Sequence, residues 1–361
     1  MTKNTTPPTQ QGHIHIDRLT VNGPIKHTPL GELFYKNANN LGMVPAGASA
    51  YTPKRRRNPR PDDLYIKSSD IQANEMAYRL LFDCCPPQIL QGHNFFGHSN
   101  LLDYAYTIFD RQLSNHDLTA TQQERDLWRT GKLISVSQVH LTGNFWMHSH
   151  LKPMFINAID EANSSGKHRD IETCITLGFT EARRSTQQTA CVYDKLALLD
   201  KHWKKPGEYQ AKLKALADGS IRVEIRLYEG GLAYRGLKSA AAWATLDVDA
   251  LFFELLAGFH IANAIQPLLT QYEEQQLSPS ELITYTLWMH NERLERLLSA
   301  STISRHARAI ESKVNIDIRS HRRPEKLPEL DLKELLSPAN LVPLPEWAAT
   351  GGKYWAPGQL N

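Results

Sequence analysis

The sequence predicts an α+β protein whose strands come first and whose helices follow. Over residues 13–235, several short runs alternate apolar and polar side chains, the pattern of strands with one buried face. After about residue 236 the apolar spacing turns helical, with long segments at 247–269 and 280–298. A run of strands followed by a run of helices indicates two parts. We therefore expect a disordered lead at 1–12, a strand-rich domain at 13–235, a helical region at 236–325 and a tail at 326–361.

The predicted strands each have a polar face opposite an apolar one. The strand expected at residues 13–21 turns its isoleucines to one face and three polar side chains to the other: His13, His15 and Asp17. Residues 221–227 give the clearest strand, and its polar face carries Arg222, Glu224 and Arg226. The remaining strands are expected at 132–145, which Gly143 interrupts, at 173–177 and at 189–196.

Two helices are expected among these strands. Residues 100–113 have apolar side chains at helical spacing, with Ser99 or Asn100 as the N-cap. A second helix begins at Pro153, because proline suits a first turn, and extends through Ala162. Both helices therefore belong to the strand-rich domain.

Composition excludes several classes of protein. The chain has 361 residues, enough for one large or two modest cores, and a formal net charge of only +3. Its four cysteines include the adjacent Cys84 and Cys85 but no C-x-x-C pair, so we expect neither a disulfide framework nor a zinc finger. Residues 1–11 lack the apolar core of a signal peptide, and no apolar run approaches the ~20 residues of a membrane span. We expect a soluble protein of the cytoplasm with no membrane partner.

Basic residues gather in two places. Residues 51–63 form a proline-rich basic loop in which Arg55 and Arg56 are either DNA phosphate contacts or part of a solvated loop. Residues 299–310 predict a helix capped by Ser301 or Thr302, which with the preceding helix suggests a helix-turn-helix-like unit. DNA contacts are expected from this helix and from the basic segment that follows it: Arg305, His306, Arg308, Arg322 and Arg323. The alternative is an amphipathic helix with a solvated basic face.

Two islands in the sequence resemble a known family. Residues 88–97 read Gln-Ile-Leu-Gln-Gly-His-Asn-Phe-Phe-Gly and resemble the Leu-Gln-Gly-His-Asn-x-Phe-Gly signature of filamentous-phage replication initiators of the gene II/X family. Residues 192–195, Val-Tyr-Asp-Lys, resemble the segment that carries the DNA-nicking tyrosine of that family. Further similar segments follow in the family's order at 15–21, 138–142, 189–200, 221–226, 298–308 and 315–318.

The resemblance implies a ferredoxin-like/HUH-type nuclease core with an antiparallel sheet, followed by a helical C-terminal DNA-binding region. It implies a rolling-circle initiator in the bacterial host cytoplasm that nicks one strand of a double-stranded phage or plasmid origin through a covalent phosphotyrosine and rejoins it. The implied partners are double-stranded origin DNA, single-stranded DNA, the host replicative helicase and the single-strand-binding protein. Two positions depart from the family pattern, because His140 replaces an aspartate and Leu198 replaces a glutamate.

The resemblance makes Tyr193 the nucleophile. A phenol with a pKa of ~10 needs a neighbouring cation or base before it attacks a phosphodiester. If residues 189–196 are a strand, Lys195 shares the face of Tyr193 and either lowers that pKa or stabilises the charged phosphorus. We expect the phenol oxygen to be open to solvent, beside ionisable groups from distant strands. The alternative is an ordinary half-buried tyrosine of a strand.

A divalent metal that polarises the scissile phosphate is the second expectation. Mg²⁺ and Mn²⁺ prefer oxygen-rich sites, and adjacent strands can gather such ligands. The candidate ligands are Asp17, His93, His140 and Glu224. For each of them the alternative is a surface or hydrogen-bonded polar residue.

Other polar residues have several possible roles. The pairs His13/His15 and His148/His150 have the two-residue spacing of ligand pairs, but one is near the terminus and the other precedes a helix. Asn94 lies between glycines that allow close backbone approach, so it contacts DNA, binds metal or shapes a turn. DNA contacts are also expected from Arg222 and Arg226.

Three functions of different classes follow. The first is a metal-dependent, site-specific DNA endonuclease with strand-joining activity that acts from Tyr193. The second is a non-catalytic origin-DNA-binding replication or regulatory protein, in which His140 marks a decayed metal site. The third, a zinc hydrolase built on the 15 histidines, lacks an H-E-x-x-H spacing.

Overall fold

The computed structural model describes most of the chain. The described residues are 12–34, 49–51, 64–162, 167–171, 173–180, 183–184, 187–259, 264–265, 269, 271–289, 292–314, 316, 318–319, 329–330 and 332–358. Residues 1–11 of the expected lead lie outside this part of the chain. The same holds for four predicted DNA contacts, Arg55, Arg56, Arg322 and Arg323.

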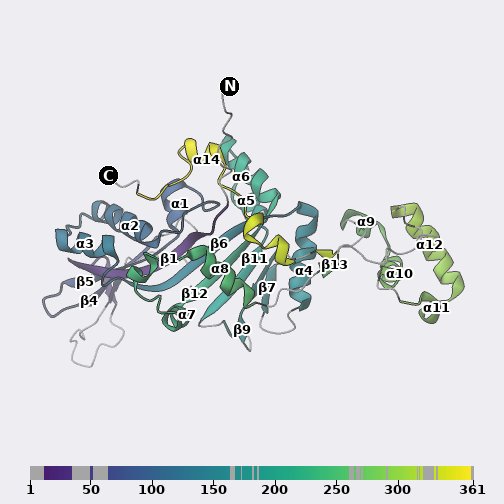
Figure 1. The fold of residues 1–361 in the computed structure, drawn as a ribbon, viewed down its shortest axis with the longest axis horizontal. Helices are drawn as coiled ribbons and strands as arrows, with labels where there is room; N and C mark the ends of the chain where they lie inside the picture. Colours follow the sequence, from purple (N-terminus) through teal and green to yellow (C-terminus); the bar gives the residue numbers. More distant parts are fainter. Residues whose placement is uncertain are drawn as a thin grey trace, which may run out of the picture.

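A ten-stranded sheet with antiparallel pairing occupies the centre of the molecule (Figure 1). Its strand order is β2-β3-β4-β5-β1-β6-β12-β11-β8-β7. The strands are β1 (His15–His27), β2 (Glu32–Phe34), β3 (Ser49–Tyr51), β4 (Tyr65–Ile71), β5 (Ala77–Cys84), β6 (Ser135–Trp146), β7 (Lys167–Ile171), β8 (Cys174–Leu177), β11 (Gln188–Tyr193) and β12 (Ser220–Tyr228). Two small ribbons pair β9 (Phe179–Thr180) with β10 (Arg183–Arg184) and β13 (Ala264–Ile265) with β14 (Glu329–Leu330).

The helices fall into two sets. Those that surround the sheet are α1 (Pro86–Gln91), α2 (Leu101–Asn115), α3 (Gln122–Thr130), α4 (Lys152–Ala162), α5 (Lys195–His202), α6 (Glu208–Asp218), α7 (Glu229–Tyr234), α8 (Val248–Ala257), α13 (Leu332–Leu335) and α14 (Glu346–Thr350). A second set is α9 (Gln271–Gln276), α10 (Pro279–Met289), α11 (Leu294–Leu297) and α12 (Ala300–Val314). Short 3₁₀ turns span Ser149–Leu151, Ala240–Trp243 and Pro338–Asn340. The predicted α+β class with an antiparallel sheet is confirmed, and the ferredoxin-like/HUH-type assignment stays a prediction.

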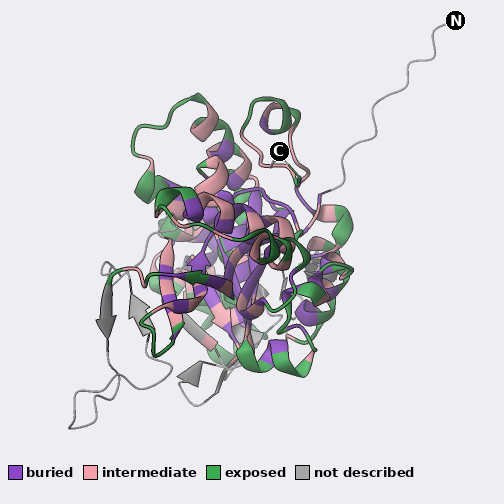
Figure 2. Cartoon of the chain, turned by 90° about the vertical axis from the view of Figure 1, so that its left-hand side faces the viewer, coloured by how far each residue is buried: buried purple, intermediate pink, exposed green. Residues whose placement is uncertain are grey.

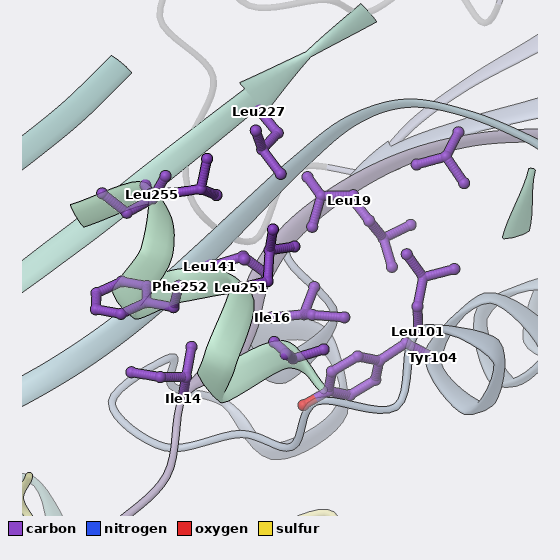
Figure 3. Close-up of a cluster of buried hydrophobic side chains, with 14 of the residues drawn as sticks. Ile14, Ile16, Leu19, Leu101, Tyr104, Leu141, Leu227, Leu251, Phe252 and Leu255 are labelled. Carbon is purple, nitrogen blue, oxygen red and sulfur yellow. The ribbon is translucent and has the colours of Figure 1, made fainter. Parts of the chain in front are cut away.

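The apolar face of the sheet packs on α2 and α8 (Figure 3). Ile16 of β1, Leu141 of β6 and Leu227 of β12 are fully buried there. Phe252 of α8 and Tyr104 of α2 belong to the same buried cluster. Each aliphatic side chain of this size contributes about 1.5–3 kcal/mol when it is fully buried. The alternation in the sequence therefore produces the main core, and buried residues concentrate in the sheet and on the inner faces of its helices (Figure 2).

The polar face of the sheet is covered at one end by residues 88–97, named here the signature loop. Asn144 of β6 donates from Nδ2 to the carbonyl of Phe95 in this loop at 2.8 Å. Phe95 and Phe96 join a separate buried cluster with Leu213 of α6 and Val342 near the C-terminus. This end of the sheet, where polar strand residues meet the loop, holds the candidate site.

The second set of helices has its own small core. Leu277, Tyr285, Leu294 and Ile310 are among its buried members. In Figure 1 these helices lie apart from the sheet. Residues 237–256, which we assigned to the helical region, instead pack in the core of the sheet. The core of the larger unit therefore extends beyond the predicted boundary at residue 235.

Several predicted elements differ in length. β6 runs through Gly143, which pairs with Val223, and a Cβ at this position would lie 2.8 Å from Ile14 Cδ1. Glycine therefore allows close packing here and does not interrupt the strand. The helix expected at 247–269 ends at Ala257, and the one expected at 280–298 is divided into α10 and α11.

The helix ends follow side-chain caps. Asn100, one of the two expected residues, accepts a hydrogen bond from Asp103 N at the start of α2. At α12 the cap is Ser299 and not Ser301 or Thr302, because Ser299 Oγ accepts from Thr302 N at 3.2 Å. Among the helices that the structure describes, none is long and apolar enough to span a bilayer.

Candidate active site

Tyr193 and Lys195 lie at a junction between a strand and a helix. β11 ends at Tyr193, and Lys195 is the first residue of α5. The side chain of Asp194 caps this helix by accepting a hydrogen bond from Leu196 N at 3.0 Å. The prediction that Lys195 shares a strand face with Tyr193 was wrong, because the Asp194 cap starts a helix where the alternation suggested more strand.

Strand register brings the other candidates to one face. Arg222 on β12 is the Cα partner of Tyr193 on β11 and of Asn144 on β6. Further along β12, Arg226 is the partner of His140 on β6. Directly opposed residues of neighbouring strands lie on the same face of a sheet. Polar side chains that are distant in sequence therefore meet there.

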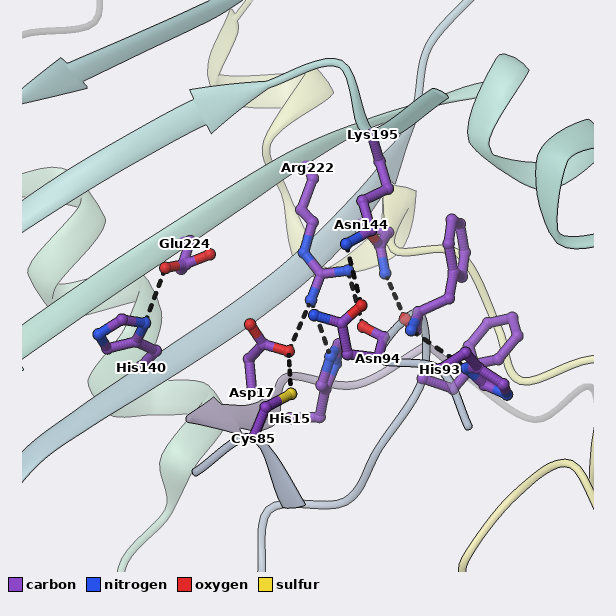
Figure 4. A network of polar contacts seen from close by, with 12 residues as sticks. His15, Asp17, Cys85, His93, Asn94, His140, Asn144, Lys195, Arg222 and Glu224 are labelled. Carbon is purple, nitrogen blue, oxygen red and sulfur yellow. Dashed lines mark hydrogen bonds and ion pairs between the residues drawn. The ribbon is translucent and has the colours of Figure 1, made fainter. Parts of the chain in front are cut away.

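Four polar residues of this face form what we name the Glu224 cluster: His140, Tyr193, Glu224 and Arg226. Glu224 Oε1 accepts from Arg226 Nε at 2.6 Å and lies 2.8 Å from His140 Nδ1, a contact drawn in Figure 4. Glu224 Oε2 accepts from the Tyr193 hydroxyl at 3.4 Å. Burial raises the pKa of the Glu224 carboxyl, but Arg226 and His140 lower it more, so this pKa lies well below its usual value. Glu224 is therefore an anion surrounded by three donors.

Beside it lies the Arg222 cluster, which consists of His15, Asp17, Asn94, Lys195 and Arg222 (Figure 4). The fully buried guanidinium of Arg222 lies 3.2 Å from Asp17 Oδ1 and 3.5 Å from His15 Nε2, and it donates to the Asn94 carbonyl at 2.7 Å. Lys195 Nζ donates to Asn94 Oδ1 at 2.9 Å. Burial and the charge of Arg222 lower the pKa of Lys195 to about 8 and hold the pKa of His15 well below its usual value.

The Tyr193 phenol is less accessible than we expected. Only 7 % of this residue is exposed, so the prediction of an oxygen open to solvent was wrong. Its neighbours are nevertheless ionisable, since Glu224 accepts its hydrogen bond and Arg222 lies opposite. Burial raises the pKa of Tyr193 well above its usual value; Arg222 opposes this shift and Glu224 adds to it. In this arrangement the phenol keeps its proton.

His93 serves the signature loop and not a metal. Its Nδ1 accepts from Phe95 N at 3.2 Å, so Nε2 carries the proton and donates to the Lys353 carbonyl at 2.7 Å. Burial lowers the pKa of His93 to about 4, although the Lys353 carbonyl opposes this shift. Both ring nitrogens are occupied, which leaves the ring no lone pair for a ligand bond.

The two carboxylates predicted to bind Mg²⁺ or Mn²⁺ are each paired with an arginine in this arrangement. Across the part of the chain that the structure describes, no group of three or more His, Cys, Asp or Glu side chains is placed to hold one. Asp17 is paired with Arg222, and Glu224 is engaged by Arg226 and His140. Each carboxylate thus has an arginine as its partner.

Three buried polar atoms at the site lack a hydrogen-bond partner among the described residues: Arg222 Nε, Thr142 Oγ1 and Asn144 Oδ1. Thr142 and Asn144 are the β6 partners of Glu224 and Arg222. An unpaired buried polar group costs about 1–3 kcal/mol, so such atoms usually bind water or a ligand. These three atoms are therefore able to form hydrogen bonds with water or with a ligand.

The predicted DNA contacts near the site differ in exposure. Asn94 and Arg222 are buried in the Arg222 cluster, so their side chains offer no surface to DNA. Arg226 keeps 25 % of its side chain exposed while it pairs with Glu224. Of these three residues, Arg226 alone can reach a bound strand without rearrangement.

The predicted DNA contacts on α12 also differ in exposure. Arg305 and Arg308 are exposed. His306 is buried, and its Nδ1 lies 2.7 Å from the hydroxyl of Thr284 on α10. Its ring is part of the contact between two helices, so it is not available to DNA in this arrangement.

Two further residues of the site, Cys85 and Asn144, were not predicted from the sequence. Cys85 donates from Sγ to Asp17 Oδ1 at 3.5 Å, and Asn144 holds the signature loop through Phe95. Neither residue stands in a motif, and only the order of the strands places them at the site. Of the two histidine pairs, His15 belongs to the Arg222 cluster, whereas His148 and His150 are exposed.

A comparison with protein families identifies the chain. A family model described as the N-terminal part of the phage gene II replication-associated protein matches residues 60–245, just over half of the 361 residues. The matched segment contains the signature loop, Tyr193, Lys195 and Glu224, but neither Asp17 nor the second set of helices. The chain therefore belongs to this family of filamentous-phage gene II replication initiators and has a replication-associated role. No sequence among curated proteins matches the chain significantly.

Proposed function

We propose that this protein initiates rolling-circle replication by nicking one strand of a double-stranded origin with Tyr193 and later rejoining it. One observation carries the proposal: the Tyr193 hydroxyl contacts Glu224 at 3.4 Å, beside Arg222 and Arg226, within the family-matched segment. One face of the sheet therefore carries a nucleophile, a carboxylate that orients the proton of this nucleophile, and cations suited to a phosphate.

In the proposed step, the Tyr193 oxygen attacks the phosphorus of the scissile phosphodiester. A phosphorus–oxygen bond forms to tyrosine, and the bond from phosphorus to the 3′ oxygen breaks. The phenol proton passes to solvent while Glu224 orients the hydroxyl, and the 3′ oxygen takes up a proton. Arg226 and Lys195 stabilise the extra negative charge on phosphorus. Rejoining is the reverse attack of the 3′ hydroxyl on the phosphotyrosine, which needs no nucleotide cofactor.

Binding of double-stranded origin DNA is proposed for the second set of helices. Arg305 and Arg308 project from α12, and neither forms an ion pair with another described residue. Arginines of this kind suit phosphate contacts that set the register of a protein on DNA. The use of Mg²⁺ or Mn²⁺, the host helicase, the single-strand-binding protein and the bacterial cytoplasm are proposed on the family resemblance alone.

The test is nicking of a supercoiled plasmid that carries the cognate phage origin, with Mg²⁺ and with a chelator. We expect the wild-type protein to convert it to open circles, and Tyr193→Phe to lower the rate by at least about 1000-fold because the nucleophile is lost. Origin affinity is expected to stay within about twofold. Tyr234→Phe, at an exposed tyrosine, is the matched control. Undiminished nicking by Tyr193→Phe contradicts the proposal.

A second function, origin binding without catalysis, is favoured by one observation. Tyr193 is buried with a raised pKa, and arginines engage the carboxylates around it. If this function is correct, the wild-type protein binds the origin tightly but leaves the plasmid supercoiled at every pH and with either metal.

A further inference from the structure

Asn94 of the signature loop contacts two cations at once. Its side-chain Oδ1 accepts from Lys195 Nζ, and its backbone carbonyl accepts from Arg222, at 2.9 Å and 2.7 Å. Lys195 follows Tyr193 by two residues in the sequence. Arg222 is the partner of Tyr193 on the neighbouring strand β12. All of these residues are buried. One loop residue therefore holds two cations together at the site, and one of them, Arg222, acts directly on the charge of Tyr193.

We propose that Asn94 is a positioning residue for nicking, which holds Lys195 and Arg222 beside Tyr193 and does not itself contact DNA. This inference rests on the proposed function for its catalytic consequence. It replaces our expectation that Asn94 binds DNA, because the side chain is turned towards Lys195 (Figure 4).

The amide side chain suits this role because it is an acceptor without charge. Two cations held close together repel each other, and an uncharged oxygen orients an ammonium group without neutralising it. The loop itself is held in place, since Asn144 binds Phe95 and His93 binds the Lys353 carbonyl. Groups positioned in this way by packing and a second layer of hydrogen bonds are kept near a productive geometry.

An aspartate at position 94 would change the charge and not the shape. Besides burial, the charged groups that act on Lys195 are Arg222, which disfavours its protonated form, and Asp17 and Glu224, which favour it. A carboxylate in place of the Asn94 amide would lie within hydrogen-bond distance of Nζ. We therefore expect Asn94→Asp to raise the pKa of Lys195 from about 8 by one unit or more.

The experiment follows the titration of Lys195 by NMR in the full-length chain, with ¹³C at the ε carbon of lysine. The Lys195→Arg variant assigns the resonance by its loss. Asn94→Asp and Asn94→Ala are compared with Gln88→Ala, which removes an exposed hydrogen bond of the same loop. Thermal unfolding checks that each variant folds.

We expect the Lys195 midpoint to rise in Asn94→Asp and to stay unchanged in Gln88→Ala. Nicking by Asn94→Ala is expected to fall about 10- to 100-fold in kcat, with KM for origin DNA within about twofold, because a cation is displaced. An unchanged Lys195 midpoint in a folded Asn94→Asp variant overturns the inference. A shifted midpoint supports the positioning of Lys195 even if the wild-type protein never nicks DNA, a result that defeats the proposed function alone.

Discussion

At the scale of single residues, the negative charges of the site are neutralised by neighbouring side chains and not by solvent. Asp17 and Glu224 are buried, and each lies against an arginine at 3.2 Å or closer. Breaking such a buried pair from one side costs several kcal/mol, because the remaining charge has no partner. Loss of one charged side chain on the polar face therefore destabilises its partner as well. Neutral imidazoles, such as that of His93, are also part of the site.

His93 predicts a pH dependence of stability. Its pKa is about 4 in the folded protein and near 6.5 when unfolded, so below pH 6.5 the unfolded chain binds more protons. The stability from the neutral ring is thus fully present above pH 6.5 and is lost as the pH falls towards 4. Between pH 7 and 4.5 we expect a loss of about 2 to 3 kcal/mol from this group.

Urea unfolding of the wild-type protein and of His93→Gln at pH 7 and 4.5 measures this loss. Glutamine retains a donor for the Lys353 carbonyl but has no group that titrates in this range. The change in unfolding free energy between the two pH values is expected to be smaller in the variant by that amount. Equal changes in both proteins would show that His93 does not carry the effect.

At the scale of elements, alternation predicted the strands well and their ends poorly. Residues 221–227 fall within β12, and their apolar residues lie in the core as expected. The end of β11 was misplaced because one side chain, Asp194, begins a helix. The pairing of Glu224 with His140 and Arg226 was not predictable, since it depends on the order of ten strands and on register over distant segments.

The exposed face of α12 gives a prediction for DNA binding. Arg305→Ala and Arg308→Ala are each expected to weaken origin binding and to reduce the salt dependence of the affinity by about one unit in log–log slope, because each removes one phosphate contact. Fluorescence anisotropy with a labelled duplex over a range of KCl concentrations measures this slope. Lys313→Ala is the matched control, since Lys313 pairs with Glu281. If Arg305→Ala and Arg308→Ala have the same log–log slope as the wild-type protein and Lys313→Ala, these arginines of α12 do not contact DNA.

At the scale of the whole molecule, a segment close to the C-terminus packs against the site. Residues 341–358, named the C-terminal segment, lie on β6, the signature loop and α2. Val342 N donates to the Asn144 carbonyl at 2.8 Å, and Trp355 N donates to Gln91 Oε1 at 2.7 Å. Gly358 N reaches Asp103 of α2 at 2.7 Å. Although we expected a tail here, this segment secures the loop that carries Asn94.

A chain that ends at residue 340 is therefore expected to lose stability and nicking together. Removal of the buried Leu341 and Val342 alone costs at least about 3 kcal/mol of unfolding free energy. Urea unfolding and plasmid nicking measure the two losses. A chain that ends at residue 358 keeps every contact named above and is the control. Wild-type stability and nicking in the shorter chain would mean that the segment has no part in the site.

The most direct measurement of the central claim is mass spectrometry of a trapped adduct between the protein and an origin oligonucleotide that is cut but cannot be rejoined. We expect the peptide that contains Tyr193 to carry the 5′-phosphate of the cut strand, and Tyr193→Phe to give no adduct. A link at any other residue, or cleaved DNA with no protein attached, would contradict the central claim.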